Sequence, residues 1–124
     1  MKVEQADLER AEQLLKKIIK RTEIDHSLSA SDRVDAPIYF KFENTQRTGS
    51  FKIRGAYNKI ANLSAEEKRR GVVASSAGNH AQGVALSAKL AGVKSTIVMP
   101  ENAPLNKLVA TKNYGADIIL HGEI

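Results

Sequence analysis

Apolar residues recur along the chain with two different spacings, and these spacings predict its secondary structure. Residues 5–20 place apolar side chains three or four positions apart, which predicts an amphipathic helix. The apolar stripe of this helix consists of Leu8, Ala11, Leu15, Ile18 and Ile19. Residues 25–36 are small and polar and predict a loop. Residues 38–42 alternate apolar and polar side chains, as a strand does.

Capping residues divide the rest of the chain into further elements. Ser50 is a candidate N-cap for a helix over about 51–62. Ser64 and Glu67 have the spacing of a capping box, which predicts a second short helix ending at Gly71. The expected elements after it are strand 72–74, helix 80–91, strand 96–99, helix 104–113 and strand 117–120. This alternation predicts an α/β fold, with a three-layer open parallel sheet, flanking helices and right-handed crossovers. No residues follow to cover the last strand, so we expect a piece of a longer protein.

Composition narrows the class of protein. The chain has 124 residues, of which 42% are hydrophobic and 27% charged, as in a soluble globular domain. No apolar run is long enough for a membrane span, and the charged N-terminus does not resemble a signal peptide. The sequence contains no cysteine, which excludes disulfides and thiolate metal sites, and no metal site is expected. We therefore expect a cytoplasmic protein that does not enter a membrane.

The net charge of +5 raises the question of a nucleic-acid partner. The basic residues are scattered, however, and the one basic run, Lys68 to Arg70, ends a predicted helix, where cations are favourable. Nucleic-acid binding is therefore not expected. A phosphorylated small molecule is a simpler use of the positive charge.

The segment SSAGNHAQG at residues 75–83 is the first candidate for a binding site. It joins the carboxyl end of a predicted parallel strand to a helix, and ligands bind at this place in open α/β sheets. The backbone N–H groups at a helix start favour a carboxylate or phosphate, and Asn79 and His80 add polar side chains. A plain loop with a capping asparagine is the alternative. Val84 and Ala85 stand where a nucleotide-binding P-loop needs Lys and Ser or Thr, so that motif is excluded.

Lys52 is the second candidate, because it lies between Phe51 and Ile53 at a predicted helix start. Apolar surroundings and the positive end of a helix dipole both disfavour an ammonium ion, which makes the amine a better nucleophile. Such a lysine can form a Schiff base. The alternatives are that Lys52 extends along apolar surface into solvent and that Arg54 is a simple surface charge.

Two long motifs carry a family resemblance. They are KFENTQRTGSFKIRGAYNKI at 41–60 and GVVASSAGNHAQGVALSAKLAG at 71–92, and the similarity continues through 97–107 and 114–122. In this order and separation they resemble the fold-type II enzymes that depend on pyridoxal phosphate (PLP). These enzymes have the tryptophan synthase β-like fold. Among them the chain is most similar to biodegradative threonine dehydratases.

The resemblance implies a role for each candidate residue. Lys52 would hold PLP as a Schiff base and act as the catalytic base, Phe51 would pack against the cofactor ring, and Asn79 would hydrogen-bond its phenolic oxygen. The loop that grips the substrate carboxylate would consist of Ser76, Ala77, Gly78, Asn79 and His80. The implied reaction of this lyase is β-elimination, which converts L-threonine to 2-oxobutanoate and ammonia, or L-serine to pyruvate. Such enzymes serve threonine catabolism or isoleucine biosynthesis, and the full-length protein is expected to be a homo-oligomer.

The resemblance also sets the expected domains and the alternatives. Residues 1–49 would belong to the larger PLP domain, and residues 50–124 would form most of the smaller substrate-binding domain. The loop that binds the cofactor phosphate lies further downstream in the family, so the chain alone is expected to have little activity. Serine racemase is the competing activity, but Ala77 lacks the hydroxyl that racemisation uses at this position. The other alternative is a non-catalytic α/β unit. The sequence does not decide between threonine and serine as the preferred substrate, and it does not show whether the enzyme is under allosteric control.

Overall fold

A parallel three-stranded sheet organises the C-terminal part of the protein. The structure is a computed structural model that describes residues 2–123. Strands β3 (Val72–Ser75), β4 (Ser95–Met99) and β5 (Asp117–Leu120) lie in the order β3-β4-β5. Val72 is paired with Ser95, and Thr96 with Asp117. The expected open parallel sheet is confirmed, and the three strands begin and end within one residue of their predicted positions.

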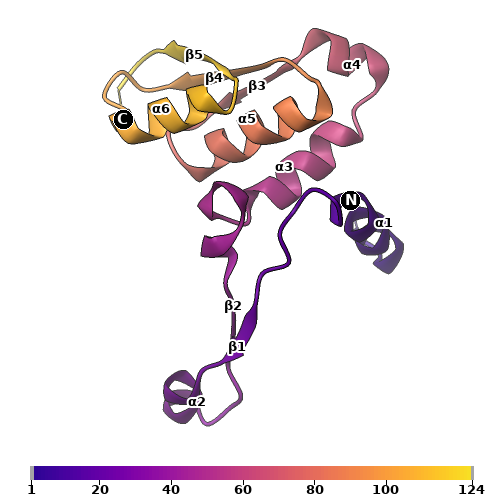
Figure 1. The fold of residues 1–124 in the computed structure, drawn as a ribbon, viewed down its shortest axis with the longest axis vertical. Helices are drawn as coiled ribbons and strands as arrows, with labels where there is room; N and C mark the ends of the chain where they lie inside the picture. Colours follow the sequence, from indigo (N-terminus) through magenta and orange to yellow (C-terminus); the bar gives the residue numbers. More distant parts are fainter. Residues whose placement is uncertain (1, 124) are drawn as a thin grey trace.

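Two helices make the crossovers between these strands. Helix α5 (Asn79–Ala91) connects β3 to β4, and α6 (Leu105–Asn113) connects β4 to β5. Because right-handed crossovers that proceed in one direction place their helices on one face, α5 and α6 lie on the same side of the sheet (Figure 1). Gly92 ends α5 with a φ of +67°, a conformation that glycine adopts without steric cost. None of the helices within residues 2–123 is long and apolar enough to cross a bilayer.

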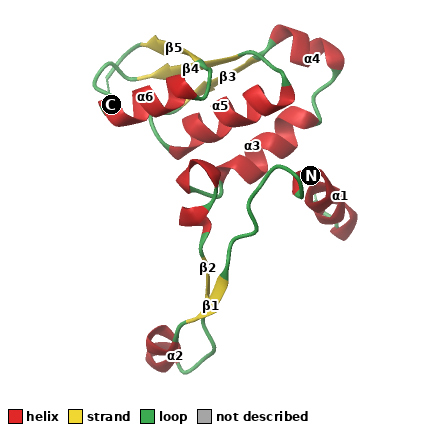
Figure 2. Cartoon of the chain, viewed as in Figure 1, coloured by secondary structure: helices red, strands yellow, loops and turns green. Residues whose placement is uncertain are grey.

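The core is built around α5. This helix contacts both α6 and the preceding helix α3 (Lys52–Ala61), and it packs on the strands (Figure 2). The buried core residues are Ala56, Ile60, Ala81, Val84, Ala85, Ala88, Val93, Ile97, Met99 and Ala116. Helix α5 buries three of its alanines and Gly83, and these small side chains let neighbouring elements approach its backbone closely.

A close approach joins α5 to the beginning of α3. A Cβ atom added at Gly83 would lie 3.1 Å from both the carbonyl carbon and the Cβ of Lys52, and 3.3 Å from the nitrogen of Ile53. These distances are shorter than ordinary carbon contacts. The two helix backbones therefore touch at a position where only glycine fits without displacement.

A short helix, α4 (Ala65–Arg70), follows α3 and has the predicted capping box. Glu67 N–H donates to Ser64 Oγ at 3.2 Å, and Ser64 N–H donates to Glu67 Oε2 at 2.8 Å. Its last turn carries Lys68, Arg69 and Arg70, as the sequence indicates. The helix ends at Gly71, as predicted.

The first helix is shorter than its apolar spacing predicts. Helix α1 spans Gln5–Leu15 and contacts α3, whereas the apolar stripe extends to Ile19. The chain leaves the helix because the backbone of Lys20 pairs with the side chain of Gln46. Lys20 N–H donates to Gln46 Oε1 at 2.9 Å, and Gln46 Nε2 donates to the Lys20 carbonyl at 2.8 Å. A tertiary contact thus overrides the local helical pattern.

An arm extends away from the helices and sheet (Figure 1). It contains the antiparallel strands β1 (Ile24–His26) and β2 (Tyr39–Lys41), with helix α2 (Leu28–Val34) between them. The strand near 38–42 is confirmed. The loop expected over 25–36 is wrong, because Ser27 caps α2 by accepting from Ala30 N–H at 3.3 Å and Ile24 pairs with Lys41. The arm exposes large apolar side chains, namely Ile24, Leu28, Val34, Tyr39 and Phe40.

Two glycines test the contact between α3 and α5. Gly83→Ala should destabilise the fold by about 1–3 kcal/mol, because the crowding atoms belong to the α3 backbone and cannot move separately. Gly55→Ala is the matched control, since its added Cβ meets nothing within 4 Å. It should stabilise the fold by up to about 1 kcal/mol, through helix propensity alone. Urea unfolding midpoints measure both, and equal shifts of the same sign would contradict the tight contact.

Candidate functional site

Lys52 is the first residue of α3, and its side chain is exposed. Its Nζ lies 5.3 Å from the centroid of the Phe51 ring, which is itself 58% exposed. Ile53, the neighbour on the other side, is completely buried, so it does not share the exposed surface of Lys52. The expectation that apolar residues surround Lys52 on both sides is therefore wrong, because consecutive residues of a helix do not face each other. Phe51 alone supplies apolar surface, in a geometry that favours a cation over the ring.

The predicted substrate loop connects the end of β3 to the start of α5. Ser76 N–H donates to the Val98 carbonyl at 3.0 Å, which holds the loop at the edge of the sheet. Gly78 N–H donates to Ser76 Oγ at 3.2 Å, a local turn that orients the serine hydroxyl. The N-cap of α5 is Gly78 rather than Asn79, so the alternative of a capping asparagine is wrong.

The beginning of α5 has the features of an anion site. No side chain of residues 2–123 caps its first N–H groups, and the first two helical residues, Asn79 and His80, are exposed. Uncapped N–H groups at a helix start carry a partial positive charge and point toward whatever binds there. The loop can therefore bind a carboxylate or a phosphate in this place.

The contact at Gly83 brings the two candidate segments together. Gly83 lies one turn after Asn79 and His80 on α5, and it touches the backbone of Lys52 on α3. The amine-bearing helix start and the loop-bearing helix start are thus held side by side. Phe51, Lys52 and Asn79 keep exposed side chains, whereas Ser76, Ala77 and Gly78 are half-buried.

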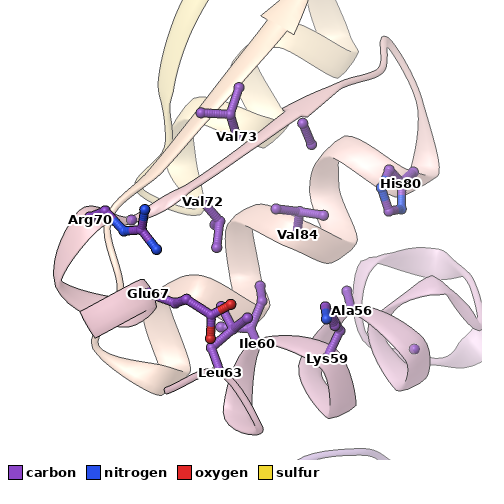
Figure 3. A pocket seen from close by; sticks show the side chains of 13 residues that line it. Ala56, Lys59, Ile60, Leu63, Glu67, Arg70, Val72, Val73, His80 and Val84 are labelled. Carbon is purple, nitrogen blue, oxygen red and sulfur yellow. The ribbon is translucent and has the colours of Figure 1, made fainter. Parts of the chain in front are cut away.

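A well-formed hollow lies elsewhere, between α3 and its other neighbours. This pocket of about 640 Å³ lies between α3, α4, β3 and α5 (Figure 3). Apolar side chains such as Ile60, Leu63 and Val84 line it, together with His80. Of the predicted site residues, His80 alone reaches this pocket.

An ion pair joins Glu43, which precedes Lys52 in the sequence, to Arg54, which follows it. Arg54 Nε donates to Glu43 Oε2 at 2.8 Å, and the second guanidinium nitrogen donates to Oε1 at 2.7 Å. Thr22 Oγ1 also donates to Glu43 Oε1, at 2.6 Å. The Arg54 hydrogen bonds are the main reason why the pKa of Glu43 falls from 4.5 to about 2. The same pairing raises the pKa of Arg54, which is therefore not the simple surface charge that the sequence left open.

Glu43, Thr22 and Gln46 were not identified from the sequence. Glu43 lies in the 3-10 helix η1 (Glu43–Thr45), which precedes a second one, η2 (Arg47–Gly49). The partners of these side chains are distant in sequence, 11 to 26 residues away, so no local spacing signals them. The buried state of Gln46 and Thr22 is visible only in the structure.

The fold and the exposed amine beside an open helix start define an α/β protein that can hold an anionic small molecule and react with its carbonyl. Residues 15–123 match the family described as "Pyridoxal-phosphate dependent enzyme". Because the match covers most of the chain, the protein belongs to this family of PLP-dependent enzymes. The fold-type II assignment is confirmed.

Curated relatives indicate the branch of the family. The chain is 57% identical over 118 residues to an L-threonine ammonia-lyase of Thermotoga maritima, covering 95% of this chain and 29% of that protein. It is 51% identical over 117 residues to the catabolic L-threonine dehydratase TdcB of Escherichia coli, covering 94% and 36%. The chain thus spans about a third of the length of the curated relatives it matches.

Solved structures with the same fold include two activities. Maize serine racemase superposes with a TM-score of 0.87 at 40% identity, covering 96% of this chain and 36% of that one. Threonine deaminase isoform 2 of Solanum lycopersicum gives a TM-score of 0.81 at 36% identity, covering 98% and 35%. The fold is therefore common to racemases and deaminases, and it does not by itself separate them.

The residues present fit the cofactor of the family. PLP needs an accessible amine, a flat surface for its ring and hydrogen-bond donors for its oxygens. Lys52 and Phe51 are exposed and adjacent, and the uncapped start of α5 provides donors. The Oγ1 atom of Thr48, in η2, is also buried without a hydrogen-bond partner among the described residues. Within residues 2–123, no group of three or more metal-ligating side chains is gathered.

The ion pair predicts a pH dependence of stability. The pKa of Glu43 is lowered in the folded state, so the pair stabilises the fold above pH 4.5, and this contribution is lost as the pH falls toward 2. Glu43→Gln should cost about 1–3 kcal/mol at pH 7 and almost nothing at pH 2. Urea unfolding between pH 2 and 7 measures this difference. Glu101→Gln, at an exposed carboxylate outside the pair, is the control, and an equal pH profile for both variants would contradict the prediction.

Proposed function

We propose that this chain supplies the cofactor-binding lysine and the substrate loop of a threonine/serine ammonia-lyase. The reaction would convert L-threonine to 2-oxobutanoate and ammonia, or L-serine to pyruvate and ammonia. The observation that carries the proposal is the contact at Gly83, which packs the start of α3, where the exposed Lys52 lies, against α5 one turn after the loop. Identities of 51–57% to proteins named as threonine dehydratases or ammonia-lyases support the same activity.

Each residue has a defined task in this proposal. PLP, when bound, draws electron density from the α-carbon of the amino acid and so makes its proton acidic. Lys52 holds the cofactor between turnovers and removes that proton once its amine is free. Phe51, whose ring is exposed, would pack against the cofactor ring, and the exposed Asn79 would donate a hydrogen bond to its phenolic oxygen.

The loop before α5 binds the substrate carboxylate. Its residues are Ser76, Ala77, Gly78, Asn79 and His80, and the uncapped N–H groups of the helix start provide the complementary charge. Fixing the carboxylate orients the α C–H bond toward Lys52, which is the main requirement for an efficient proton transfer. The proposed substrates are L-threonine and L-serine, and the proposal includes a homo-oligomeric full-length enzyme in the cytoplasm.

The N-terminal part of the chain would belong to a different domain of the whole enzyme than the part that carries Lys52. Residues 1–49 would belong to the larger domain and residues 50–124 to the smaller one. The arm supports this division, because it exposes large apolar side chains such as Leu28 (69% exposed) and Tyr39 (61% exposed). In a full-length protein of the relatives' size, the remaining two-thirds of the chain would cover them.

Serine racemase is the second candidate, favoured by the fold similarity to the maize enzyme. Racemisation needs a second acid that returns a proton to the opposite face of the α-carbon. Ala77 has no side-chain proton to donate at the position where the resemblance places this acid. The loop therefore supports elimination over racemisation.

Reductive trapping tests the role of Lys52. The full-length protein is mixed with PLP and reduced with borohydride, which converts a Schiff base to a stable amine, and the labelled peptide is identified by mass. We expect one label, on Lys52, which Lys52→Ala removes. Lys59→Ala is the matched control on the same helix and should leave the label in place. Label spread over many lysines would overturn the assignment.

The products formed from L-serine test the choice of reaction. The full-length enzyme should form pyruvate faster than D-serine, because the loop lacks a second proton donor at Ala77. Ala77→Ser should raise the ratio of racemisation to deamination by about tenfold or more. Chiral chromatography and a pyruvate assay on the same sample measure both rates. Faster interconversion of the serine enantiomers than deamination in the unmodified enzyme would establish the racemase instead.

A further inference from the structure

The turn that precedes Lys52 is held in an unfavourable conformation. Thr48 has a φ of 63° and a ψ of 8°, in the left-handed region that a β-branched residue rarely adopts. Its hydroxyl is also buried without a partner among the described residues. Both features favour relaxation of the turn, so other contacts must hold it in place.

Glu43 and Arg54 form a tie across this turn. The carboxylate lies in η1, before the strained residue, and the guanidinium lies on the first turn of α3, two residues after Lys52. The two groups share a pair of parallel hydrogen bonds, of 2.8 and 2.7 Å. A paired fork of this kind fixes direction as well as distance, because both groups are planar.

Two further side chains anchor the same turn to the segment after α1. Thr22, which is 6% exposed, donates to Glu43 Oε1 at 2.6 Å. Gln46, which is 3% exposed, forms two hydrogen bonds with the backbone of Lys20 and also accepts from Arg47 N–H at 2.9 Å. The tie is therefore buried on one side and resists displacement.

We propose that Glu43 and Arg54 are positioning residues for Lys52. The ion pair fixes the first turn of α3 from the side of η1, while Gly83 fixes it from the side of α5. Together they determine where the Lys52 amine lies relative to the substrate loop. The inference rests on the proposed function of Lys52, and it adds residues that contact neither the cofactor nor the substrate.

Positioning predicts a different result from general stabilisation. The substrate loop lies between β3 and α5, and the hydrogen bonds of the ion pair do not involve it. Loss of the pair should therefore move the amine but leave the carboxylate site intact. Proton transfer would slow, whereas substrate binding would change little, because an error of about 1 Å in the position of a reacting group can reduce a rate by about a hundredfold.

The experiment compares four variants of the full-length PLP-loaded enzyme with the unmodified enzyme. Glu43→Gln keeps the shape but removes the charge, Arg54→Lys keeps the charge but removes the fork, and Thr22→Val removes the third donor. Ser64→Ala is the control, because it removes the cap of α4 without touching the turn before Lys52.

Two quantities are measured for each variant. The first is the rate at which Lys52 becomes labelled when PLP is returned to the apo enzyme and trapped with borohydride at timed intervals. The second is kcat and KM for L-threonine, with kcat expressed per bound cofactor. For Glu43→Gln we expect about a tenfold or larger loss in both the labelling rate and kcat, with KM within about threefold of the unmodified enzyme. Arg54→Lys and Thr22→Val should show smaller losses in the same direction, and Ser64→Ala should show none.

The outcomes separate this inference from the proposed function. If the unmodified enzyme labels on Lys52 and both Glu43→Gln and Thr22→Val match it per bound cofactor, the positioning role is wrong while the function of Lys52 stands. If Ser64→Ala lost as much labelling rate and kcat as Glu43→Gln, the effect would come from general stability, and the inference would also be overturned. If the unmodified enzyme does not label on Lys52, both fail. Should Glu43→Gln not fold, Thr22→Val and Arg54→Lys decide the question.

Discussion

The contact between the backbones of α3 and α5 at Gly83 is the constraint on which the candidate site depends. Lys52 and the loop at 75–80 come from separate motifs. The absence of a side chain at Gly83 allows the two helices that carry them to pack closely. A Cβ at this position would meet backbone atoms of Lys52 and Ile53 at 3.1–3.3 Å, and it would push the amine away from the loop. The small residues of α5 thus do more than fill the core, because they set the distance between α5 and the helix start that carries Lys52.

Polar contacts and packing together fix the position of α3. Packing at Gly83 fixes α3 from one side, and the Glu43–Arg54 pair fixes it from another, with Thr22 and Gln46 behind the carboxylate. The carboxylate stays ionised well into the acidic range, because its hydrogen bonds, those from Arg54 above all, lower its pKa to about 2. The strained Thr48 lies between these supports. Strain in the turn and the contacts that resist it are therefore two parts of one arrangement around the start of α3.

The sequence predicted the elements that local signals define and missed those that distant partners define. The parallel sheet, the capping box of Ser64 and the end of α5 at Gly92 were correct, because alternation and caps act within a few residues. The end of α1 was wrong because Gln46 captures the backbone of Lys20 from 26 residues away. The motif around Lys52 was recognised, but not its exposure, nor its relation to Arg54. Those depend on which way neighbouring side chains point, and that direction is decided by packing.

The loop at the start of α5 shows how little separates two reactions on this fold. If Lys52 removes the α-proton as proposed, elimination and racemisation share the step and differ in what happens next. Racemisation needs a proton donor on the opposite face, whereas elimination needs the β-hydroxyl to leave. At the position where the resemblance places this donor, Ala77 carries no hydroxyl. Racemases and deaminases share this fold. The placement of one hydroxyl, rather than the fold or the cofactor lysine, would thus decide which product is formed.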